Sequence, residues 1–524
     1  MADTLLNWVL RGLFLLFGVG AVLALFRWMA VAVRERREKW AKRIAAIMIM
    51  LGVVYALGHA RLLLNREQIE AGRMRYAKYG DPRLAELNRA ELRGWMLDCT
   101  GEDANALARY GVRDGEVSRV YPLGEGGANF IGGGTGAENR DYTIERLFTK
   151  HLRRPNNLAE QGELHPEGTD LGLTLCIGPT RAAWELLQAT GRPGVVIVQD
   201  VRNGALVAYA ATGRAEDAPY GIKRYALPGS VFKLALSALW WDSGQPDERW
   251  ACPPFIQVGS RPIRNFESHE YASLSVPHGM LVVSCNTQSI MMAFELRRRL
   301  GMDAVRDGFR RFGFEPYSGE NPEAREDFWN TANQRWTQRM TPPPARVRLR
   351  ERYNAFEYAQ TAIGQGPVDV TPIAVSRFLQ AIGNGGVMLP VTFEQDRLDD
   401  LPEGQRIMQA ETTVKLQRAM LAVVDSGTAI RAVPILQGSG WDMGGKTGTA
   451  DVVRGHVPDG WFAGLMYGPD GRARYTVVVY VENGGQGGRV AAPIAGEMTR
   501  YMARYTAPRA EERQRVAARA EGRR

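Results

Sequence analysis

Lysine is scarce in this chain of 524 residues. Lysine and arginine together number 66, of which 8 are lysine and 58 are arginine. Arginine keeps its proton in a protein, whereas the amine of a buried lysine can lose its proton and act as a base. A lysine in this sequence is therefore a candidate for proton chemistry that arginine cannot perform.

Cysteine and histidine are scarce too, with four and six residues. Cys99, Cys176, Cys252 and Cys285 have no CxxC spacing, and the histidines form no HExxH or other paired spacing. The sequence therefore predicts neither a metal site nor a cofactor. Cys252 and Cys285 are a possible disulfide pair in an exported domain, but we expect the four cysteines to be buried free thiols.

Excess positive charge is missing from most of the chain, although the formal net charge is +9. Residues 34–43 hold six basic and two acidic side chains, and residues 504–524 hold seven arginines and three glutamates, so each segment contributes +4. The remainder is close to neutral, which excludes a broad basic surface for nucleic acid. The hydrophobic fraction of 45% predicts a globular protein of two or three domains.

Two uncharged apolar runs, at residues 12–26 and 44–60, are each near the lower length limit for a transmembrane helix. The basic segment 34–43 between them is expected to face the cytoplasm. Residues 1–65 are therefore predicted to be a membrane anchor of two helices. The alternative is a single span at residues 44–63 after an interfacial helix, and both arrangements place the long C-terminal part on the far side of the bilayer.

The rest of the chain divides by composition into three segments. Residues 66–170 are polar and rich in glycine, which predicts a small extracytoplasmic pedestal or linker domain. In residues 171–504, strand-like runs lie at both ends, one pair joined by an Arg-Asn-Gly turn, and helical patterns lie between them. This order predicts an α+β domain with one antiparallel sheet assembled from both ends. Residues 505–524 are expected to be a basic flexible tail, disordered or loosely helical.

Two arginine-rich stretches are interpreted as surface features. Residues 297–300, RRRL, are expected to be an exposed helix end. Residues 341–353, TPPPARVRLRERY, are expected to be a solvated surface loop, with a substrate groove as the alternative.

Three short motifs follow one another in the predicted α+β domain. Ser230 and Lys233 stand at i and i+3 after Pro-Gly, so a helix that begins there places both side chains on one face, near the positive end of its dipole. Ser284 and Asn286 follow in a Ser-x-Asn pair, and Lys446 begins a Lys-Thr-Gly-Thr run on a predicted strand. A Ser-x-x-Lys or Ser-x-Asn match also occurs by chance, as a helix cap with a solvated lysine. Because two of the 8 lysines lie within the three motifs, a shared site is favoured.

In this order the motifs resemble the three signatures of penicillin-recognising acyl transferases, namely penicillin-binding proteins and serine β-lactamases. The segments RVYPLGEGGANFIGGGTGAENRDYTIERL, AIGQGPVDVTPIAV and DGWFAGLMYG resemble further segments of penicillin-binding transpeptidases. The region before the motifs is too short for a glycosyltransferase domain, so the chain most resembles class B, monofunctional members. One departure is LDCTG at residues 97–101, where the family has LDR-x-G.

The resemblance implies the fold of serine β-lactamases and penicillin-binding transpeptidases. That fold is a five-stranded antiparallel sheet with helices on both faces and a mainly helical subdomain. It also implies a serine acyl-enzyme mechanism. Ser230 would attack the penultimate carbonyl of a D-Ala-D-Ala stem peptide, with Lys233 as general base. Ser284 would relay a proton to the leaving amine, and Asn286 would hold Lys233 and the substrate amide. An amine of a neighbouring stem peptide would then accept the acyl group.

The Lys-Thr-Gly-Thr run would bind the substrate. Lys446 would add positive potential, and the hydroxyls of Thr447 and Thr449 would bind the terminal carboxylate. The backbone N–H groups of Thr449 and Ser230 would form the oxyanion hole. Gly448 would let the substrate backbone approach an edge strand closely.

The partners implied by the resemblance are peptidoglycan stem peptides, β-lactams as inhibitors, the lipid bilayer and a membrane glycosyltransferase of the SEDS type. The catalytic domain would face the periplasmic side of the bacterial inner membrane. Two other classes of function remain as alternatives: a hydrolase, either a D,D-carboxypeptidase or a β-lactamase, and a non-catalytic penicillin-binding sensor or scaffold. The anchor and pedestal disfavour the first, and the three intact motifs disfavour the second.

Overall fold

The computed structural model describes Arg27 and residues 46–52, 55, 93–113, 116–133, 143–152, 169–213, 220–223, 225–316, 345–347, 349, 354–400, 403–451 and 456–521. The chain divides into two compact units, Met1–Leu87 and Asn88–Arg524. Residues 46–52 and 55 of the first unit are helical. The rest of the two predicted membrane runs and the basic segment 34–43 lie outside the described residues.

No single helix among the described residues has the length and apolar character to cross a bilayer. Helix α17 (Ala410–Asp425) and the following Ile430–Leu436 segment meet that criterion together, across a bend of 69°.

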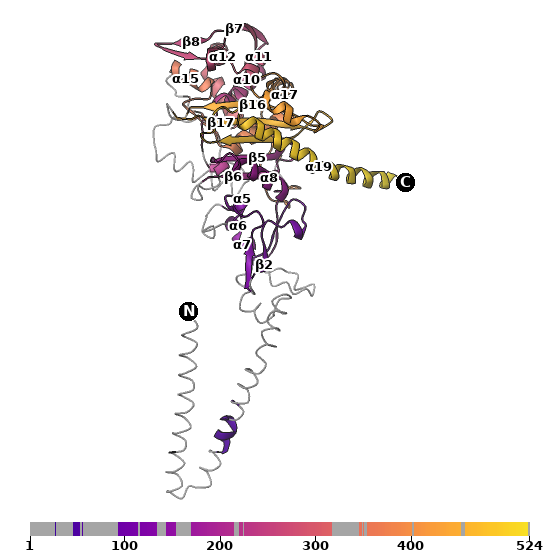
Figure 1. The fold of residues 1–524 in the computed structure, drawn as a ribbon. Helices are drawn as coiled ribbons and strands as arrows, with labels where there is room; N and C mark the ends of the chain where they lie inside the picture. The colour runs from indigo at the N-terminus through magenta and orange to yellow at the C-terminus, as the bar shows by residue number, and fades with distance from the viewer. Residues whose placement is uncertain are drawn as a thin grey trace. The chain divides into compact units, whose positions relative to one another are not determined.

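The centre of the second unit is the five-stranded antiparallel sheet that the sequence predicted (Figure 1). Its strands come from both ends of residues 171–504 and lie in the order β16-β17-β18-β5-β6, so β16 is an edge strand. Their bounds are β5 (Gly194–Asp200), β6 (Leu206–Thr212), β16 (Asp442–Ala450), β17 (Asp459–Tyr467) and β18 (Ala473–Val481). The Arg-Asn-Gly turn joins β5 and β6 as a hairpin, which confirms that prediction.

Both faces of this sheet are covered, because its strands are apolar on both sides. Along β5, Val195 and Ile197 lie in one core cluster, whereas Val196 and Val198 lie in the other, as the alternation of a strand requires. Helices α8 (Ile177–Gln188) and α19 (Ala491–Glu521) pack on one face, and α16 (Pro372–Gly383) packs on the other. This arrangement leaves β16 free to contribute to a site at the sheet edge.

A mainly helical subdomain stands beside β16 and carries two of the three motifs. Its helices and turns are η4 (Gly229–Phe232), α10 (Lys233–Asp242), α11 (His278–Val283), α12 (Asn286–Leu300), α13 (Met302–Arg311), α15 (Ala355–Ala362) and α17. Two antiparallel strand pairs complete it: β7 (Glu248–Cys252) pairs with β10 (Tyr271–Val276), and between them β8 (Phe255–Val258) forms a hairpin with β9 (Arg261–Arg264).

The described part of the predicted pedestal shares the core of the catalytic region. Met96, Leu107 and Phe130 lie in the same apolar cluster as Val195 of the central sheet. The elements here are β1 (Met96–Leu97), which pairs with β4 (Leu171–Gly172), β2 (Arg109–Arg113), which pairs with β3 (Glu116–Val120), and the helices α5 (Glu125–Ala128), α6 (Ile144–Leu147) and α7 (Thr149–Leu152). The division into two compact units therefore falls between residues 87 and 88 and not at residue 170, where the sequence analysis placed a domain boundary.

The cysteines are paired, so the expectation of free thiols was wrong. Cys99 joins Cys176 and Cys252 joins Cys285. The Cα atoms are 4.9 Å and 6.4 Å apart, within the range that a disulfide bridges. Composition could not reveal this, because the partners are 77 and 33 residues apart in sequence and meet only through the fold.

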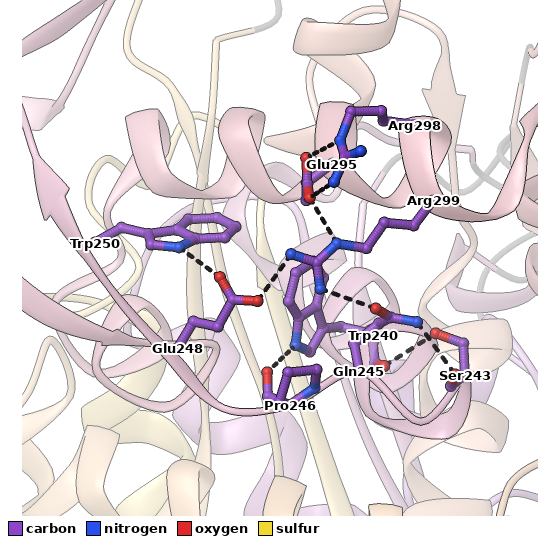
Figure 2. Close-up of polar contacts among 9 residues, drawn as sticks. All are labelled: Trp240, Ser243, Gln245, Pro246, Glu248, Trp250, Glu295, Arg298 and Arg299. Atoms are coloured by element: carbon purple, nitrogen blue, oxygen red, sulfur yellow. Dashed lines mark hydrogen bonds and ion pairs between the residues drawn. The ribbon is translucent and has the colours of Figure 1, made fainter.

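Two surface predictions need correction. Residues 297–300 end α12 as predicted, with Arg297 and Arg298 exposed, but Arg299 is half-buried because its guanidinium reaches toward β7 (Figure 2). It contacts Glu248 at 2.8 Å, Glu295 at 2.6 Å, Gln245 at 3.0 Å and the ring of Trp240 at 5.0 Å. In the predicted loop 341–353, residues Ala345–Val347 form a buried strand, β12, between β11 (Phe314–Pro316) and β13 (Val368–Asp369).

Residues 505–521, predicted as a flexible or loosely helical tail, continue α19 to Glu521. Alanine, arginine and glutamate in this stretch are strong helix formers.

Candidate active site

The first motif lies where the turn η4 passes into helix α10. Ser230 is in the turn and Lys233 is the first residue of the helix. Gly229 has a φ of +53°, and a Cβ at this position would meet the carbonyl oxygen of Thr449 at 2.5 Å. Glycine at 229 therefore lets the nucleophile turn lie directly against β16, as the Pro-Gly start of the motif allows.

The amine of Lys233 is held by the second motif. Its Nζ donates hydrogen bonds to the backbone oxygen of Ser284 at 2.7 Å and to Oδ1 of Asn286 at 2.7 Å, and it lies 3.3 Å from Oγ of Ser284. The side chain is completely buried, with no exposed area. These contacts join the first two motifs into one group of side chains.

Burial lowers the pKa of Lys233 well below its ordinary value of 10.5, and the nearby amine of Lys446 lowers it further. Desolvation has this direction because a buried ammonium loses its hydration, and a like charge adds repulsion. The neutral amine is thus favoured. It has two N–H donors and one lone pair, so the two short hydrogen bonds leave the lone pair available as a base.

The second motif sits in a turn between two helices. Ser284 ends α11 with φ 60° and ψ 39°, a left-handed conformation that only glycine adopts readily. Asn286 begins α12. Its Nδ2 donates to the backbone oxygen of Arg264 at 3.0 Å, which leaves one amide N–H for a substrate carbonyl.

The third motif occupies the edge strand β16, as predicted. Lys446 is completely buried, and its Nζ donates to the Thr447 backbone oxygen at 3.1 Å. Burial lowers the pKa of Lys446 to about 7. The hydroxyls of Thr447 and Thr428 are 2.6 Å apart and share a hydrogen bond. Nε2 of Gln365 donates to the Thr449 backbone oxygen at 3.2 Å.

The structure gives a reason for glycine at position 448 that differs from the predicted close approach of a substrate backbone. A Cβ at this position would meet the Pro228 carbonyl oxygen at 2.6 Å and side-chain atoms of Trp461 and Val231 at 3.0 Å. The close neighbour of this glycine is thus the nucleophile turn of the same protein. Its lack of a side chain lets β16 and η4 pack together.

The predicted residues meet at one cleft of about 930 Å³. Its lining includes Ser230, Ser284, Asn286, Thr447 and Thr449. The two lysines of the motifs are buried and do not line the cleft, but their amines donate hydrogen bonds to the lining residues Ser284, Asn286 and Thr447.

Several lining residues were not predicted. Arg264, Arg431 and Arg489 are exposed around the cleft, opposed by Glu267 and Asp451. Other unpredicted residues of the lining include Gln365, Thr428, His269 and Asn265. Only Gln365 had a signal in the sequence, because it lies in the AIGQGPVDVTPIAV segment. The others are separated from the motifs in sequence and belong to no short pattern.

Among the described residues, no group of three or more histidine, cysteine, aspartate or glutamate side chains could hold a metal ion. The donor set of the cleft is instead made of hydroxyls, amides and amines. Such groups suit nucleophilic acyl transfer, in which a serine, a base and N–H donors share one site.

Comparison with known proteins agrees with the resemblance to penicillin-binding transpeptidases seen in the sequence. A model of the penicillin binding protein transpeptidase domain matches residues 194–500. The chain is 30% identical over 159 residues to the probable peptidoglycan D,D-transpeptidase PenA of Neisseria flavescens, covering 29% of this chain and 38% of PenA. It is 24% identical over 487 residues to the probable peptidoglycan D,D-transpeptidase FtsI of Caulobacter vibrioides, covering 84% of this chain and 74% of FtsI.

The fold resembles that of penicillin-binding protein A from Mycobacterium tuberculosis, solved as a ceftriaxone acyl-enzyme complex. The TM-score is 0.62 at 20% identity, and the alignment covers 79% of this chain and 99% of that chain.

Proposed function

The chain belongs to the penicillin-binding protein transpeptidase family, and from this premise we propose that it is a peptidoglycan D,D-transpeptidase that forms an acyl ester on Ser230. Class B membership fits the curated relatives, which are peptidoglycan D,D-transpeptidases. The observation that carries the proposal is the buried amine of Lys233, hydrogen-bonded to the Ser-x-Asn turn beside the cleft.

Acylation begins with proton transfer from Ser230 to Lys233. The lone pair of the neutral Lys233 amine takes the proton of Ser230 Oγ, and Oγ attacks the carbonyl carbon of the penultimate D-Ala. The backbone N–H groups of Ser230 and Thr449 stabilise the oxyanion that forms. The close approach of Gly229 to the Thr449 backbone supports this pairing of donors.

The leaving group is the amine of the terminal D-Ala. As the C–N bond breaks, this nitrogen takes a proton from Ser284 Oγ, which is replenished from Lys233, 3.3 Å away. In the second step a neutral amine of another stem peptide attacks the ester. A new C–N bond forms, the C–Oγ bond breaks, and the proton lost by the amine returns to Oγ of Ser230 along the same path.

Substrate binding would use the strand β16 and the charged mouth of the cleft. Thr447 and Thr449 line the cleft, and the buried amine of Lys446 donates to the Thr447 backbone oxygen. Three arginines against two acidic residues give the mouth a positive excess. A peptide that ends in a carboxylate fits this charge.

The membrane anchor, the periplasmic location and a SEDS-type glycosyltransferase partner belong to the same proposal. They rest on the apolar runs 12–26 and 44–60 and on family membership. β-Lactams are proposed as inhibitors because a member of the same fold was solved with ceftriaxone as its acyl-enzyme.

The test is time-resolved intact mass spectrometry of the full-length protein in detergent, mixed with benzylpenicillin. We expect a stoichiometric adduct that maps to Ser230 and persists for many minutes, and none in Ser230→Ala. Rapid loss of the adduct with drug turnover would indicate a β-lactamase. A folded wild-type protein without any adduct would contradict the proposal and favour a non-catalytic scaffold. Release of free D-Ala from a stem peptide without cross-linked product would indicate a carboxypeptidase.

A further inference from the structure

The turn that carries Ser284 and Asn286 needs external support. Ser284 has a left-handed backbone conformation, which is strained for a non-glycine residue and persists only where neighbouring contacts hold it. All the hydrogen-bond acceptors that position the Lys233 amine lie on this turn. A shift of the turn therefore moves the base as well.

The residue between the two catalytic side chains is Cys285, which is joined to Cys252 at the end of β7. Both cysteines are completely buried. The sulfur of Cys285 also accepts a hydrogen bond from the backbone N–H of Gln288 at 3.3 Å, so it caps helix α12. The disulfide thus ties the turn and the start of α12 to the strand β7.

Asn265 adds a second tie at the same place. Its Oδ1 accepts hydrogen bonds from the backbone N–H groups of Asn286 at 2.8 Å and Thr287 at 3.1 Å. Its Nδ2 donates to the backbone oxygens of Pro253 at 2.7 Å and His269 at 2.9 Å. The side chain is 4% exposed and uses all its amide hydrogen-bonding capacity. It therefore joins the first turn of α12 to two other segments.

The strand β7 is itself fixed along the length of α12. Arg299, near the end of α12, contacts Glu248 at 2.8 Å (Figure 2). In the first turn of α12, Nε2 of Gln288 donates to the Trp250 backbone oxygen at 2.7 Å. At the start, the Thr287 hydroxyl donates to the Pro253 backbone oxygen at 2.9 Å. The disulfide is therefore anchored to a strand that cannot shift independently of α12.

We propose that the Cys252–Cys285 disulfide and Asn265 are positioning residues, which hold Ser284 and Asn286 where they orient the Lys233 amine toward Ser230. Acylation then depends on oxidation of this one pair of cysteines. Formation of the bond converts two thiols to a disulfide, and an external disulfide takes the two electrons and two protons and becomes two thiols. The inference rests on the proposed acyl-enzyme function.

The chain offers a matched control, because the Cys99–Cys176 disulfide does not touch the motifs. We would compare the full-length double variants Cys252→Ser/Cys285→Ser and Cys99→Ser/Cys176→Ser with the wild type. Rapid-mixing measurements with a fluorescent penicillin separate the dissociation constant of the non-covalent complex from the first-order acylation rate constant. Melting temperatures record the stability of each variant.

We expect the acylation rate constant of Cys252→Ser/Cys285→Ser to fall by at least about tenfold, since misplacing a base by 1 Å has effects of this order. Its dissociation constant should change little, because the residues that contact the ligand remain. The control variant should keep its acylation rate even with a lower melting temperature. Equal losses in both variants, or no loss in Cys252→Ser/Cys285→Ser, would overturn the proposal.

A second variant guards against a failure to fold. Asn265→Ala keeps the disulfide, removes the acceptor for the start of α12 and both Nδ2 hydrogen bonds, and buries no charge, so a folded protein with a slower acylation step is expected. An acylation rate equal to that of the wild type would contradict the role of Asn265.

Hydrogen exchange of residues 278–290 supplies a readout that needs no catalysis. Faster exchange in Cys252→Ser/Cys285→Ser than in the control would support the positioning role. Because this result does not require a reaction with penicillin, it tests the positioning role separately from the proposed acyl-enzyme function. Unchanged exchange in this segment would refute the positioning role.

Discussion

Lys233 and Lys446 are both completely buried, and burial shifts the protonation of both amines toward the neutral form. An exposed lysine would be protonated at neutral pH and could not accept the proton of Ser230. Here desolvation lowers both pKa values, and the charge of Lys446 lowers that of Lys233 further. Substitutions of the two lysines test this effect of burial.

Lys233→Met should lower the acylation rate constant by about 10²–10⁴-fold, the usual range for loss of a general base. Methionine tests the base role more specifically than arginine does, because arginine would place a permanent charge in a buried position and also destabilise the fold. Lys415→Met, on the partly exposed Lys415 of α17, is the control and should acylate normally. Penicillin labelling measures both. Normal acylation of Lys233→Met would remove Lys233 as the base.

The acylation rate should rise with pH until Lys233 is deprotonated, because only its neutral amine is a base. It should then decline above about pH 7 as Lys446 loses the charge that attracts the substrate carboxylate. Lys446→Met should move the rising limb to higher pH, since removing a neighbouring charge raises the pKa of Lys233. Rate measurements between pH 5 and 9 decide this, and an unmoved rising limb would show that the two amines do not interact.

At the scale of elements, the site depends on close packing between the turn η4 and the edge strand β16. A Cβ on Gly229 would collide with the carbonyl oxygen of Thr449 at 2.5 Å. A Cβ on Gly448 would collide with the carbonyl oxygen of Pro228 at 2.6 Å. The nucleophile and the substrate-binding strand are therefore positioned by the same interface. A side chain inserted there should affect stability and acylation together.

Gly448→Ala should destabilise the protein by about 1–3 kcal/mol, as overpacking does in a close-packed core. It should also slow acylation, because β16 must move away from η4. Gly496→Ala on α19 is the matched control: its Cβ would meet nothing closer than 3.4 Å. Alanine in a helix is favoured over glycine, so the control should be neutral or slightly stabilised. Thermal unfolding and penicillin labelling test both, and a Gly448→Ala protein as stable as the control would contradict the packing argument.

At the scale of the whole molecule, residues 88–524 form one compact unit in which the segment before residue 171 is part of the core. The Cys99–Cys176 disulfide and the pairing of β1 with β4 cross the predicted boundary at residue 170. A catalytic domain that begins at residue 171 would expose the apolar side chains that Met96, Leu107 and Phe130 cover. Solubility should therefore depend on where a fragment begins.

We expect a fragment of residues 88–524 to be soluble, to unfold cooperatively and to bind penicillin covalently. A fragment of residues 171–524 should aggregate or melt at a much lower temperature. Size-exclusion chromatography, thermal unfolding and penicillin labelling compare the two. Equal stability of the fragments would restore the boundary at residue 170.

The residues of the candidate site could be predicted because their chemistry restricts both type and spacing. Ser230 and Lys233 must share a helical turn, Ser284 and Asn286 a tight turn, and Lys446 the strand that binds substrate. Such spacings are local, so they are visible in the sequence, and the rarity of lysine made two of them stand out. The strand-like runs at both ends of residues 171–504 likewise predicted one antiparallel sheet assembled from both ends.

Tertiary structure alone decided the contacts between residues far apart in the chain. The pairing of Cys99 with Cys176, the ties from Asn265 to Asn286 and Thr287, and the inward turn of Arg299 follow from how helices and strands pack. The pKa of Lys233 belongs here as well, because it depends on exclusion of water and on the distance to Lys446. Local patterns determine which groups are present, whereas burial and long-range packing determine their protonation, orientation and support.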